Sequence, residues 1–578
     1  MNLRAPGCRA SACALLLGAC AAAAAHESPP QADAAQPNVL LIPANDAALR
    51  QQLGSRFGHL QAEPNALRVE ADAQDRAWLD AQGISWRIDE QASALLHASL
   101  QPLSDQRAIP GHACYRTVEE TFATMDQLAA SYPALATVID IGDSWKKVQN
   151  PALGYDLRVL KLGNSAIGGV KPKMFAMTAI HAREYTTAEL LTRYAEELLN
   201  GYGTDADATW LLDHHEFHFL LHANPDGRKK AESGSSWRKN INDTLCQGSG
   251  AGIDLNRNYP VWWSYPNGGS STNACSETYR GTAAASEPET QAVRDYLESI
   301  FPDRRPGNPE TVATAADANT QGLFLDIHSY SKLVLWPWGH VTAPTGNAEQ
   351  LATLGMRLAW FNNYEPQQAV GLYPTRGTTD DFAYGDLGLP SYTIELGVAF
   401  FESCDSFENA TLPINLQALR YAARTLHAPY VLPAGPDAID VSIPQATIVA
   451  GQPATLAARI DDSRYRNQQQ PTDAPSAARP RHNIAGARYF IGKLPWEAGA
   501  VGADMQASDG SFDATAESVT AQIDTTNLSA GRHVVYVQGR DAANEVGPPA
   551  AAFLCVLDPV VIFGGGFEES SAACEAGR

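Results

Sequence analysis

The chain has 578 residues, of which 44% are hydrophobic and 18% are charged. This composition is typical of a folded globular protein and excludes a disordered one. The length predicts roughly three to four domains. Acidic residues outnumber basic ones by 64 to 42, giving a net charge of −22. Such a charge argues against a nucleic-acid backbone as a partner.

The first 25 residues have the layout of a secretory signal. Arg4 and Arg9 precede an apolar run, Ala10–Ala25, which is too short and too weakly hydrophobic to favour a membrane span. Leu17–Cys20 also resembles a bacterial lipoprotein cleavage box, so anchoring through a lipidated Cys20 is an open alternative to secretion. No later segment reaches spanning length. We therefore expect a secreted, periplasmic or extracellular protein.

Six cysteines remain after those of the leader, an even number that favours disulfides in an exported chain. They are Cys114, Cys246, Cys275, Cys404, Cys555 and Cys574. None has C-x-x-C spacing, so a cysteine zinc knuckle is not expected.

A linker and a small α+β unit are predicted for residues 26–108. We expect strands at 39–42, 67–69 and 84–88 and helices at 46–57 and 74–82. The unit precedes the catalytic candidates described below, so an accessory domain and a folding or inhibitory prosegment both fit. Arg107 lies in a polar connector suited to processing.

The central unit, residues 109–433, alternates strands with helices, which predicts a mixed sheet covered on both faces. The helix Thr117–Tyr132 precedes strands expected at 136–141, 157–162, 174–180, 215–221, 322–327 and 391–396.

A metal site is predicted at the end of the strand 174–180. Thr186 and Glu189 have capping-box spacing, so the next helix should begin at Thr186. His181 and Glu184 then lie in the turn at the carboxyl edge of the sheet, where open α/β folds bind ligands. Taken alone, H-x-x-E is a weak motif.

Two further side chains point to the same site. His328 follows the strand 322–327, and Glu395 lies within an apolar strand, where an ionised carboxylate is costly unless a metal, a cation or a reacting water is near. By contrast, the histidines between 214 and 222 are dispersed over two faces of a strand and are expected to be structural.

These motifs, in this order, resemble the zinc metallocarboxypeptidases of the carboxypeptidase A type, and especially the secreted bacterial enzymes similar to carboxypeptidase T. The resemblance runs from about Tyr115 to about Pro433. HAREYTTAE and HSYSKLVLWPWG look like the two zinc motifs. Further matches are Asn224–Gly227, Trp237–Lys239, Asp254–Asn258 and Cys275–Tyr279. Tyr373 and Glu395 are also separated by the family's spacing between its mobile tyrosine and its catalytic glutamate, 395 − 373 = 22 residues.

The resemblance implies an α/β fold with a mixed eight-stranded sheet flanked by helices, and one catalytic zinc ion. Its ligands would be His181, Glu184 and His328, with two imidazoles and one carboxylate leaving an open position. Glu395 would act as general base and acid, and Arg238 would meet charge on the scissile carbonyl. Asp254 would orient His181. Whether a structural calcium ion is bound as well stays open.

Substrate contacts are also implied. Arg257 would bind a terminal carboxylate through its planar fork, with Asn256 beside it, Tyr373 as a lid and Arg183 along the approach.

The specificity pocket would have Asp380 at its base and Gly339 in its wall, favouring a C-terminal Lys or Arg. Mixed specificity stays open. Cys246 and Cys275 fall on the positions of a family disulfide.

Residues 434–558 show short alternating runs typical of an immunoglobulin-like β-sandwich, interrupted by a polar loop at 466–481. The tail 559–578 is expected to be flexible.

We therefore predict a monomeric, secreted exopeptidase acting on peptides with a free C-terminus. Two alternatives stay open: a catalytically inactive peptide-binding homologue and an amidase of cell-wall peptides. Retention of Glu395 and Arg238 argues against the first alternative.

Overall fold

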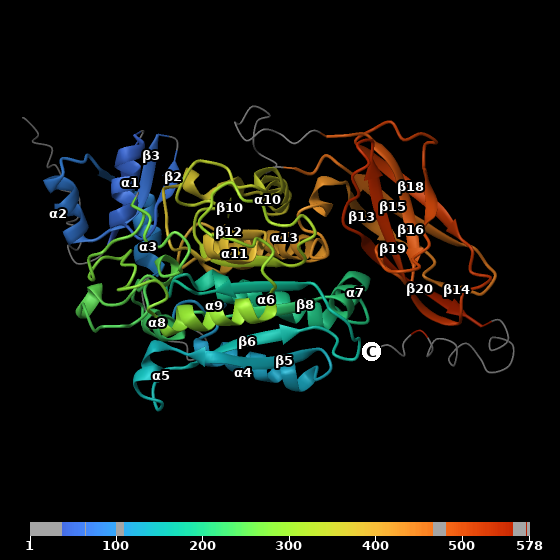
Figure 1. Cartoon of the computed structure of the whole chain (residues 1–578). Coiled ribbons are helices and arrows are strands. Elements are labelled where there is room, and N and C mark those ends of the chain that lie inside the picture. Colours follow the sequence, from blue (N-terminus) through green and yellow to red (C-terminus); the bar gives the residue numbers. More distant parts are fainter. Residues whose placement is uncertain are drawn as a thin grey trace, which may run out of the picture.

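The computed structural model describes residues 37–99, 109–465 and 481–558, except 45, 64 and 267, together with Cys574. Figure 1 shows three units in a row: the N-terminal unit in blue, the central unit, and the C-terminal unit in red. The signal, Cys20, Arg107 and most of both the 466–481 loop and the tail lie outside the described residues.

The N-terminal unit is an antiparallel four-stranded sheet with three helices. The sheet order is β2-β3-β1-β4. The strands are β1 (Asn38–Pro43), β2 (Gln61–Glu63), β3 (Ala66–Ala71) and β4 (Arg87–Ile88). The helices are α1 (Ala47–Arg56), α2 (Ala73–Ala81) and α3 (Glu90–Ser99). Asp46 and Asp72 accept hydrogen bonds from backbone amides at the starts of α1 and α2, which explains where these helices begin.

The central unit is built on a mixed eight-stranded sheet in the order β11-β10-β12-β9-β7-β8-β6-β5. Its strands are β5 (Ala136–Asp143), β6 (Asp156–Leu162), β7 (Lys173–Thr178), β8 (Glu216–Leu220), β9 (Leu323–Ser329), β10 (Leu333–Trp336), β11 (Glu365–Gln368) and β12 (Ser391–Leu396). The middle strands β12, β9, β7 and β8 are parallel, and their side chains are almost entirely buried. The predicted mixed sheet is confirmed.

Helices surround this sheet, and several of them, such as α6, α9 and α10, pack directly against its strands. They are α4 (Val118–Ser131), α5 (Trp145–Gln149), α6 (Tyr185–Gly201), α7 (Ala206–His214), α8 (Pro225–Ala231), α9 (Pro288–Ile300), α10 (Ala348–Asn362), α11 (Thr379–Leu387), α12 (Cys404–Ser406) and α13 (Leu412–Arg424).

Two predicted boundaries at the site were wrong. Helix α6 begins at Tyr185 with Glu184 as its N-cap, and Glu189 forms ion pairs with Arg116 and Arg193 instead of closing a capping box. Strand β9 extends through Ser329, so His328 lies inside it, opposite Glu395 of β12. Tertiary partners therefore override the local signals in both places.

The C-terminal unit has eight strands in the order β13-β15-β18-β17-β16-β19-β20-β14. They are β13 (Asp437–Ser442), β14 (Thr447–Val449), β15 (Ala454–Asp461), β16 (Ile484–Ile491), β17 (Ala503–Ala507), β18 (Ala516–Ile523), β19 (Gly531–Asp541) and β20 (Ala550–Leu557). One end of β17 pairs with β16 and the other with β18. Apolar residues of both halves, such as Leu456 and Val535, form one core, as in a β-sandwich.

The N-terminal unit contacts the central unit mainly through apolar and aromatic side chains. Leu335 and Tyr373 of the central unit belong to the same buried cluster as Leu53 and Phe57. The ring centroid of His59 lies 4.7 Å from that of Tyr330 and 5.0 Å from that of Phe400.

The contact with the C-terminal unit combines aromatic packing, such as Tyr536 on Trp210, with one fully buried arginine of α10. Arg357 donates to the carbonyl oxygens of Pro433 (3.1 Å) and Gly435 (2.5 Å). It also pairs with Asp437 (3.4 Å) and Asp462 (3.3 Å). The charge is thus neutralised by groups that belong to the second unit or to the connection into it.

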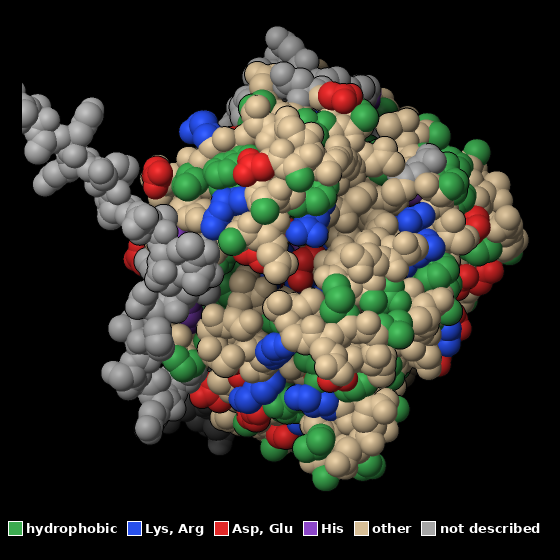
Figure 2. Space-filling view, turned by 90° about the vertical axis from the view of Figure 1, so that its left-hand side faces the viewer, with side chains coloured by type: hydrophobic (Ala, Val, Ile, Leu, Met, Phe, Trp, Pro, Cys, Tyr) green, Lys and Arg blue, Asp and Glu red, His purple; other side chains and the backbone are tan. Residues whose placement is uncertain are grey.

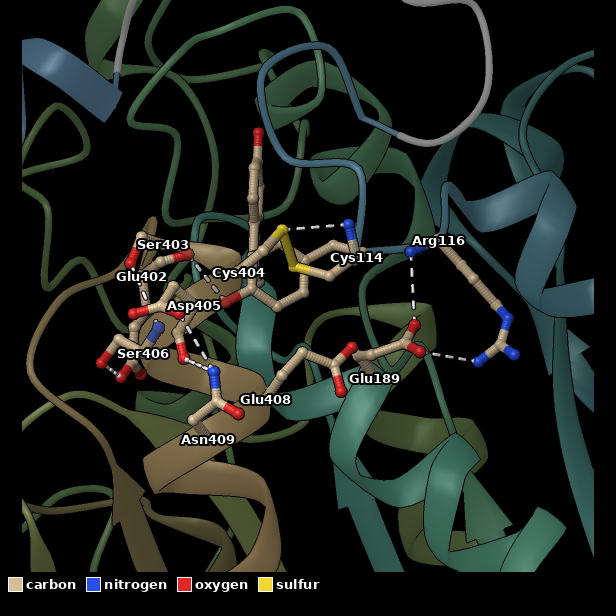
Figure 3. Close-up of a disulfide and its surroundings, with 12 residues drawn as sticks. Cys114, Arg116, Glu189, Glu402, Ser403, Cys404, Asp405, Ser406, Glu408 and Asn409 are labelled. Carbon is tan, nitrogen blue, oxygen red and sulfur yellow. Dashed lines mark hydrogen bonds and ion pairs between the residues drawn. A yellow bond between two sulfur atoms is a disulfide. The ribbon is translucent and has the colours of Figure 1, made fainter.

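Three disulfides join Cys114 to Cys404, Cys246 to Cys275 and Cys555 to Cys574. Cys114 and Cys404 are 290 residues apart, and Figure 3 shows them beside the Arg116–Glu189 ion pair. The pairing of the four cysteines left open by the sequence is thereby defined.

Among the described helices, none has both the length and the apolarity to cross a bilayer. The face seen in Figure 2 carries basic and acidic side chains interspersed.

Candidate functional site

Two imidazoles and a carboxylate converge at the carboxyl edge of the central sheet. His181 Nδ1 lies 2.7 Å from Glu184 Oε1 and 3.1 Å from His328 Nδ1. His328 Nδ1 lies 3.2 Å from Glu184 Oε2. All three side chains are buried. The structure therefore places His328, which is distant in sequence, beside the neighbouring pair His181 and Glu184.

The opposite ring nitrogens face buried carboxylates. His181 Nε2 lies 3.1 Å from Asp254 Oδ1, and His328 Nε2 lies 2.9 Å from Asp326 Oδ2. When each ring is neutral with its proton on Nε2, facing Asp254 or Asp326, both Nδ1 lone pairs face Glu184. Lone pairs and a carboxylate in such proximity repel one another unless a cation lies between them. The donor set therefore fits a zinc ion held by two histidines and one carboxylate.

Asp326 is a residue of this site that the sequence analysis missed. It lies two positions before His328 in β9, and residues two apart in a strand share a face. The strand periodicity could have identified it once His328 was chosen. Asp326 also accepts a hydrogen bond from Thr379 Oγ1 at 2.6 Å, which fixes its carboxylate.

Glu395 lines the same cavity from β12. Its Oε2 is buried and has no hydrogen-bond partner. Burial raises the pKa of Glu395 to about 7, although the nearby charge of His328 opposes the rise. A carboxyl group that titrates near neutrality can accept and return a proton with little free-energy cost.

Arg238 faces the cavity and is held by Asp254. Its Nε and Nη2 donate to Asp254 Oδ2 at 3.2 and 2.9 Å. Burial alone would raise the pKa of Asp254, but the charges of Arg238 and Arg257 hold it well below its usual range. Asp254 stays ionised, and one carboxylate thus orients both His181 and Arg238.

Arg257, Asn256 and Tyr373 also line the cavity. Arg257 is fixed by the carbonyl oxygens of Gly269 and Asn256, both at 2.7 Å, and its Nη2 lies 3.4 Å from the Tyr373 hydroxyl. The Asn256 side-chain carbonyl accepts from the Thr379 amide at 3.0 Å. The cavity therefore has a second cationic group beside the metal-ligand candidates.

Asp380, at the start of α11, lines the cavity and is buried. Burial and the adjacent Asp381 raise the pKa of Asp380 to about 7. Gly339 is not among the lining residues. Its amide donates to Asp381 Oδ1 at 3.0 Å instead, which ties the turn after β10 to α11.

Arg183 lies behind the cavity wall and does not line it. Its guanidinium carbon is 4.1 Å from the ring centroid of Phe400, a cation–π contact. The N-terminal unit reaches the cavity itself through Gly58 and His59. Among the lining residues, the centre of a water-sized sphere can move through only about 40 Å³.

Known proteins are similar to this chain in sequence and in fold. The family model described as zinc carboxypeptidase matches residues 121–403. Carboxypeptidase A1 of Rattus norvegicus is 30% identical over 339 residues, 56% of this chain and 73% of that protein. The zinc carboxypeptidase of Saccharothrix mutabilis subsp. capreolus is 30% identical over 298 residues, 50% of this chain and 62% of that protein.

A solved structure, the carboxypeptidase A from Helicoverpa armigera, superposes with a TM-score of 0.55 at 23% identity, covering 68% of this chain and 98% of that one. This similarity shows a shared fold. The 30% identity that covers 73% of the rat protein shows that the chain belongs to the zinc carboxypeptidase family.

Proposed function

We propose that the chain is an exported, monomeric zinc exopeptidase that hydrolyses the C-terminal peptide bond of peptides and proteins. One observation carries the proposal: three metal-ligand candidates, an unpartnered carboxylate and two arginines face one cavity. A binding protein needs no proton-transfer group, so Glu395 favours the enzyme over an inactive homologue. When bound, zinc polarises the scissile carbonyl and lowers the pKa of water held beside it.

The residues of the chain supply the remaining chemistry. Glu395 takes a proton from the attacking water and later gives it to the leaving amine. Arg238, held by Asp254, donates to the carbonyl oxygen as negative charge develops there. Because Asp254 and Asp326 fix the two imidazoles from behind, the ligand set is oriented before substrate binds.

Arg257 supplies the exopeptidase specificity in this proposal. A terminal carboxylate is planar and accepts two parallel hydrogen bonds, which a guanidinium offers in a fixed geometry. The Tyr373 hydroxyl is near the same arginine and would close over the bound chain end. A free C-terminus thereby distinguishes the substrate from the interior of a protein.

Asp380 supports a preference for C-terminal Lys or Arg. The carboxyl group is buried next to a second carboxylate, so a cationic substrate side chain would restore its ionised form and form a charge pair. Apolar residues would meet the protonated acid, which is consistent with mixed specificity.

The N-terminal unit would keep the enzyme latent. Tyr373 packs in the cluster of that unit, and Gly58 and His59 occupy the cavity wall. No peptide fits in the remaining space, so the unit must be displaced or removed before substrate can bind. Cleavage near Arg107 would convert the zymogen to the active enzyme.

Cleavage of a peptide library tests the function. We expect the chain freed of residues 1–108 to remove single C-terminal residues, and to stop when zinc is chelated. Glu395→Gln should reduce kcat/KM by about 10³-fold, while zinc content stays unchanged. No cleavage would favour the peptide-binding homologue, and cleavage confined to cell-wall fragments would favour the amidase.

Substrates ending in Lys, Arg, Leu and Phe test the pocket. Asp380→Ala should lower kcat/KM for Lys and Arg and leave Leu and Phe nearly unchanged. An unaltered ranking would contradict the role of Asp380 without affecting the exopeptidase proposal.

A further inference from the structure

A second group of metal-binding side chains lies in the C-terminal unit. His482, Asp541 and Glu545 each place a ligand atom within 4.8 Å of the others. His482 precedes β16, Asp541 ends β19, and Glu545 lies in the turn between β19 and β20. Strands β16 and β19 pair with Ile484 opposite Asp541, so sheet register brings together residues that are 59 positions apart (541 − 482).

Asp541 is the central member of this group. Its side chain is fully buried, and Oδ1 accepts a hydrogen bond from the Glu545 amide at 2.8 Å. Its Oδ2 is also buried and has no hydrogen-bond partner. The adjacent Arg540 does not neutralise it, because Nη1 of Arg540 donates to Asn544 Oδ1 at 2.7 Å. A buried carboxylate oxygen left without a partner is costly and calls for a cation.

The surroundings hold this geometry in place and add negative charge. Asp462, also fully buried, accepts a hydrogen bond from the His482 amide at 2.7 Å, which fixes the backbone that carries the imidazole. The Glu545 carbonyl accepts from the Asp541 amide at 3.1 Å, so the turn is closed from both sides. Arg357 pairs with Asp462 at 3.3 Å, while Asp541 Oδ2 stays without a hydrogen-bond partner.

We propose that His482, Asp541 and Glu545 bind a divalent transition-metal ion, most favourably zinc, at a site separate from the catalytic one. An imidazole with two carboxylates is a ligand set suited to zinc. Calcium takes six to eight oxygen ligands, so an imidazole donor disfavours the calcium ion considered from the sequence. The ion would fasten the segment before β16 to the β19–β20 turn and stabilise the C-terminal unit.

Metal content of the full chain tests the proposal. After chelation and reloading with zinc, we expect two equivalents of zinc per chain, measured by mass spectrometry together with calcium, manganese and nickel. His482→Ala and Glu545→Gln should each retain one equivalent, His328→Ala should also retain one, and the double variant His482→Ala/His328→Ala should retain none. His533→Ala, which removes a half-buried imidazole of the same unit, should retain two.

Thermal unfolding gives a second readout that does not depend on peptidase activity. In the His328→Ala background, adding zinc should raise the Tm, and His482→Ala should abolish that shift. A single equivalent of zinc in the wild-type chain, two equivalents in both His482→Ala and Glu545→Gln, or calcium as the second ion would overturn the proposal. The peptidase function could fail its own test without changing any of these counts.

Discussion

The central unit contacts a further unit on either side. Both contacts contain apolar and aromatic side chains, and the C-terminal one adds a buried arginine paired with two carboxylates. The N-terminal unit meets the cavity through apolar and aromatic side chains, with Tyr373 in a cluster shared between units. The C-terminal unit meets α10 through Arg357, fully buried with its charge paired to Asp437 and Asp462. One contact covers the site, whereas the other lies away from it.

This difference indicates which unit can dissociate from the central unit at the lower free-energy cost. Separating an apolar contact costs free energy in proportion to the apolar area that becomes exposed to water. Partial separation therefore costs only part of the total. Separating a buried ion network instead leaves an uncompensated charge at the outset. We therefore interpret the N-terminal unit as a removable cover and the C-terminal unit as a permanent part of the enzyme.

The largest effect is expected for Arg357→Ala. Removing Arg357 leaves the buried Asp462 without its cation and Asp437 with Arg464 alone, which should lower the free energy of unfolding by about 3–5 kcal/mol. Arg459→Ala is the matched control, because Arg459 is half exposed in its pair with Asp461 and should cost less than about 1 kcal/mol. Denaturant unfolding measures both. Equal losses would remove the distinction between the two contacts.

Release of the N-terminal unit should have the next largest effect. If the covered state is populated about 99 to 1, cleavage in the 100–108 connector and removal of the unit should raise activity about 100-fold. Assays on the same sample before and after limited proteolysis measure this directly. An intact chain as active as the cleaved one would show that residues 37–99 are an accessory domain.

Gly58→Ala should weaken the cover without removing it. A Cβ at Gly58 would lie 2.7 Å from Cδ of Arg238, and Arg238 cannot retreat freely because Asp254 holds its guanidinium. The activity of the intact chain should rise about threefold to tenfold. Gly168→Ala, where the added atom meets open space, should leave it unchanged. A decrease would mean that Gly58 is not at the contact during turnover.

The smallest effect is a pH dependence of the cover through Glu70. Burial raises the pKa of Glu70, although Arg183 and Ser236 oppose the rise, while Glu277 adds to it. Docking therefore favours the protonated acid. The docked state is fully stabilised below the pKa of the released unit, and this stabilisation is lost as pH rises through the higher docked pKa.

The ratio of intact to cleaved activity removes the pH dependence of catalysis itself. This ratio should increase a few-fold with rising pH over the window that begins at the ordinary glutamate value of about 4.5. Glu70→Gln should flatten the profile. If the ratio of intact to cleaved activity falls as pH rises, the pH dependence of docking is due to a group other than Glu70.

Local patterns predicted the sheet, and the metal-ligand candidates needed in addition the order of several motifs along the chain. His181, Glu184 and Glu395 sit at strand ends or in apolar strands, where sequence alone shows that a polar side chain is out of place. The start of α6 and the position of His328 were misjudged by one to a few residues because partners far along the chain decide them.

The remaining contacts leave no local trace in the sequence. Nothing around Gly58 indicates that it packs on Arg238, nor does the helix containing Arg357 indicate that its charge pairs in another unit. Asp541 and His482 are likewise ordinary residues until strand register joins them. Such features depend on how folded surfaces meet, which periodicity and spacing do not encode.

The bond between Cys114 and Cys404 makes nearly the whole of the central unit a single covalent ring. A backbone cut anywhere inside the ring would leave both fragments attached, whereas a cut upstream of Cys114 would free the preceding segment from the polypeptide. A cut after Cys404 would likewise free the segment that follows it, so backbone cleavage releases only the segments that lie outside the ring.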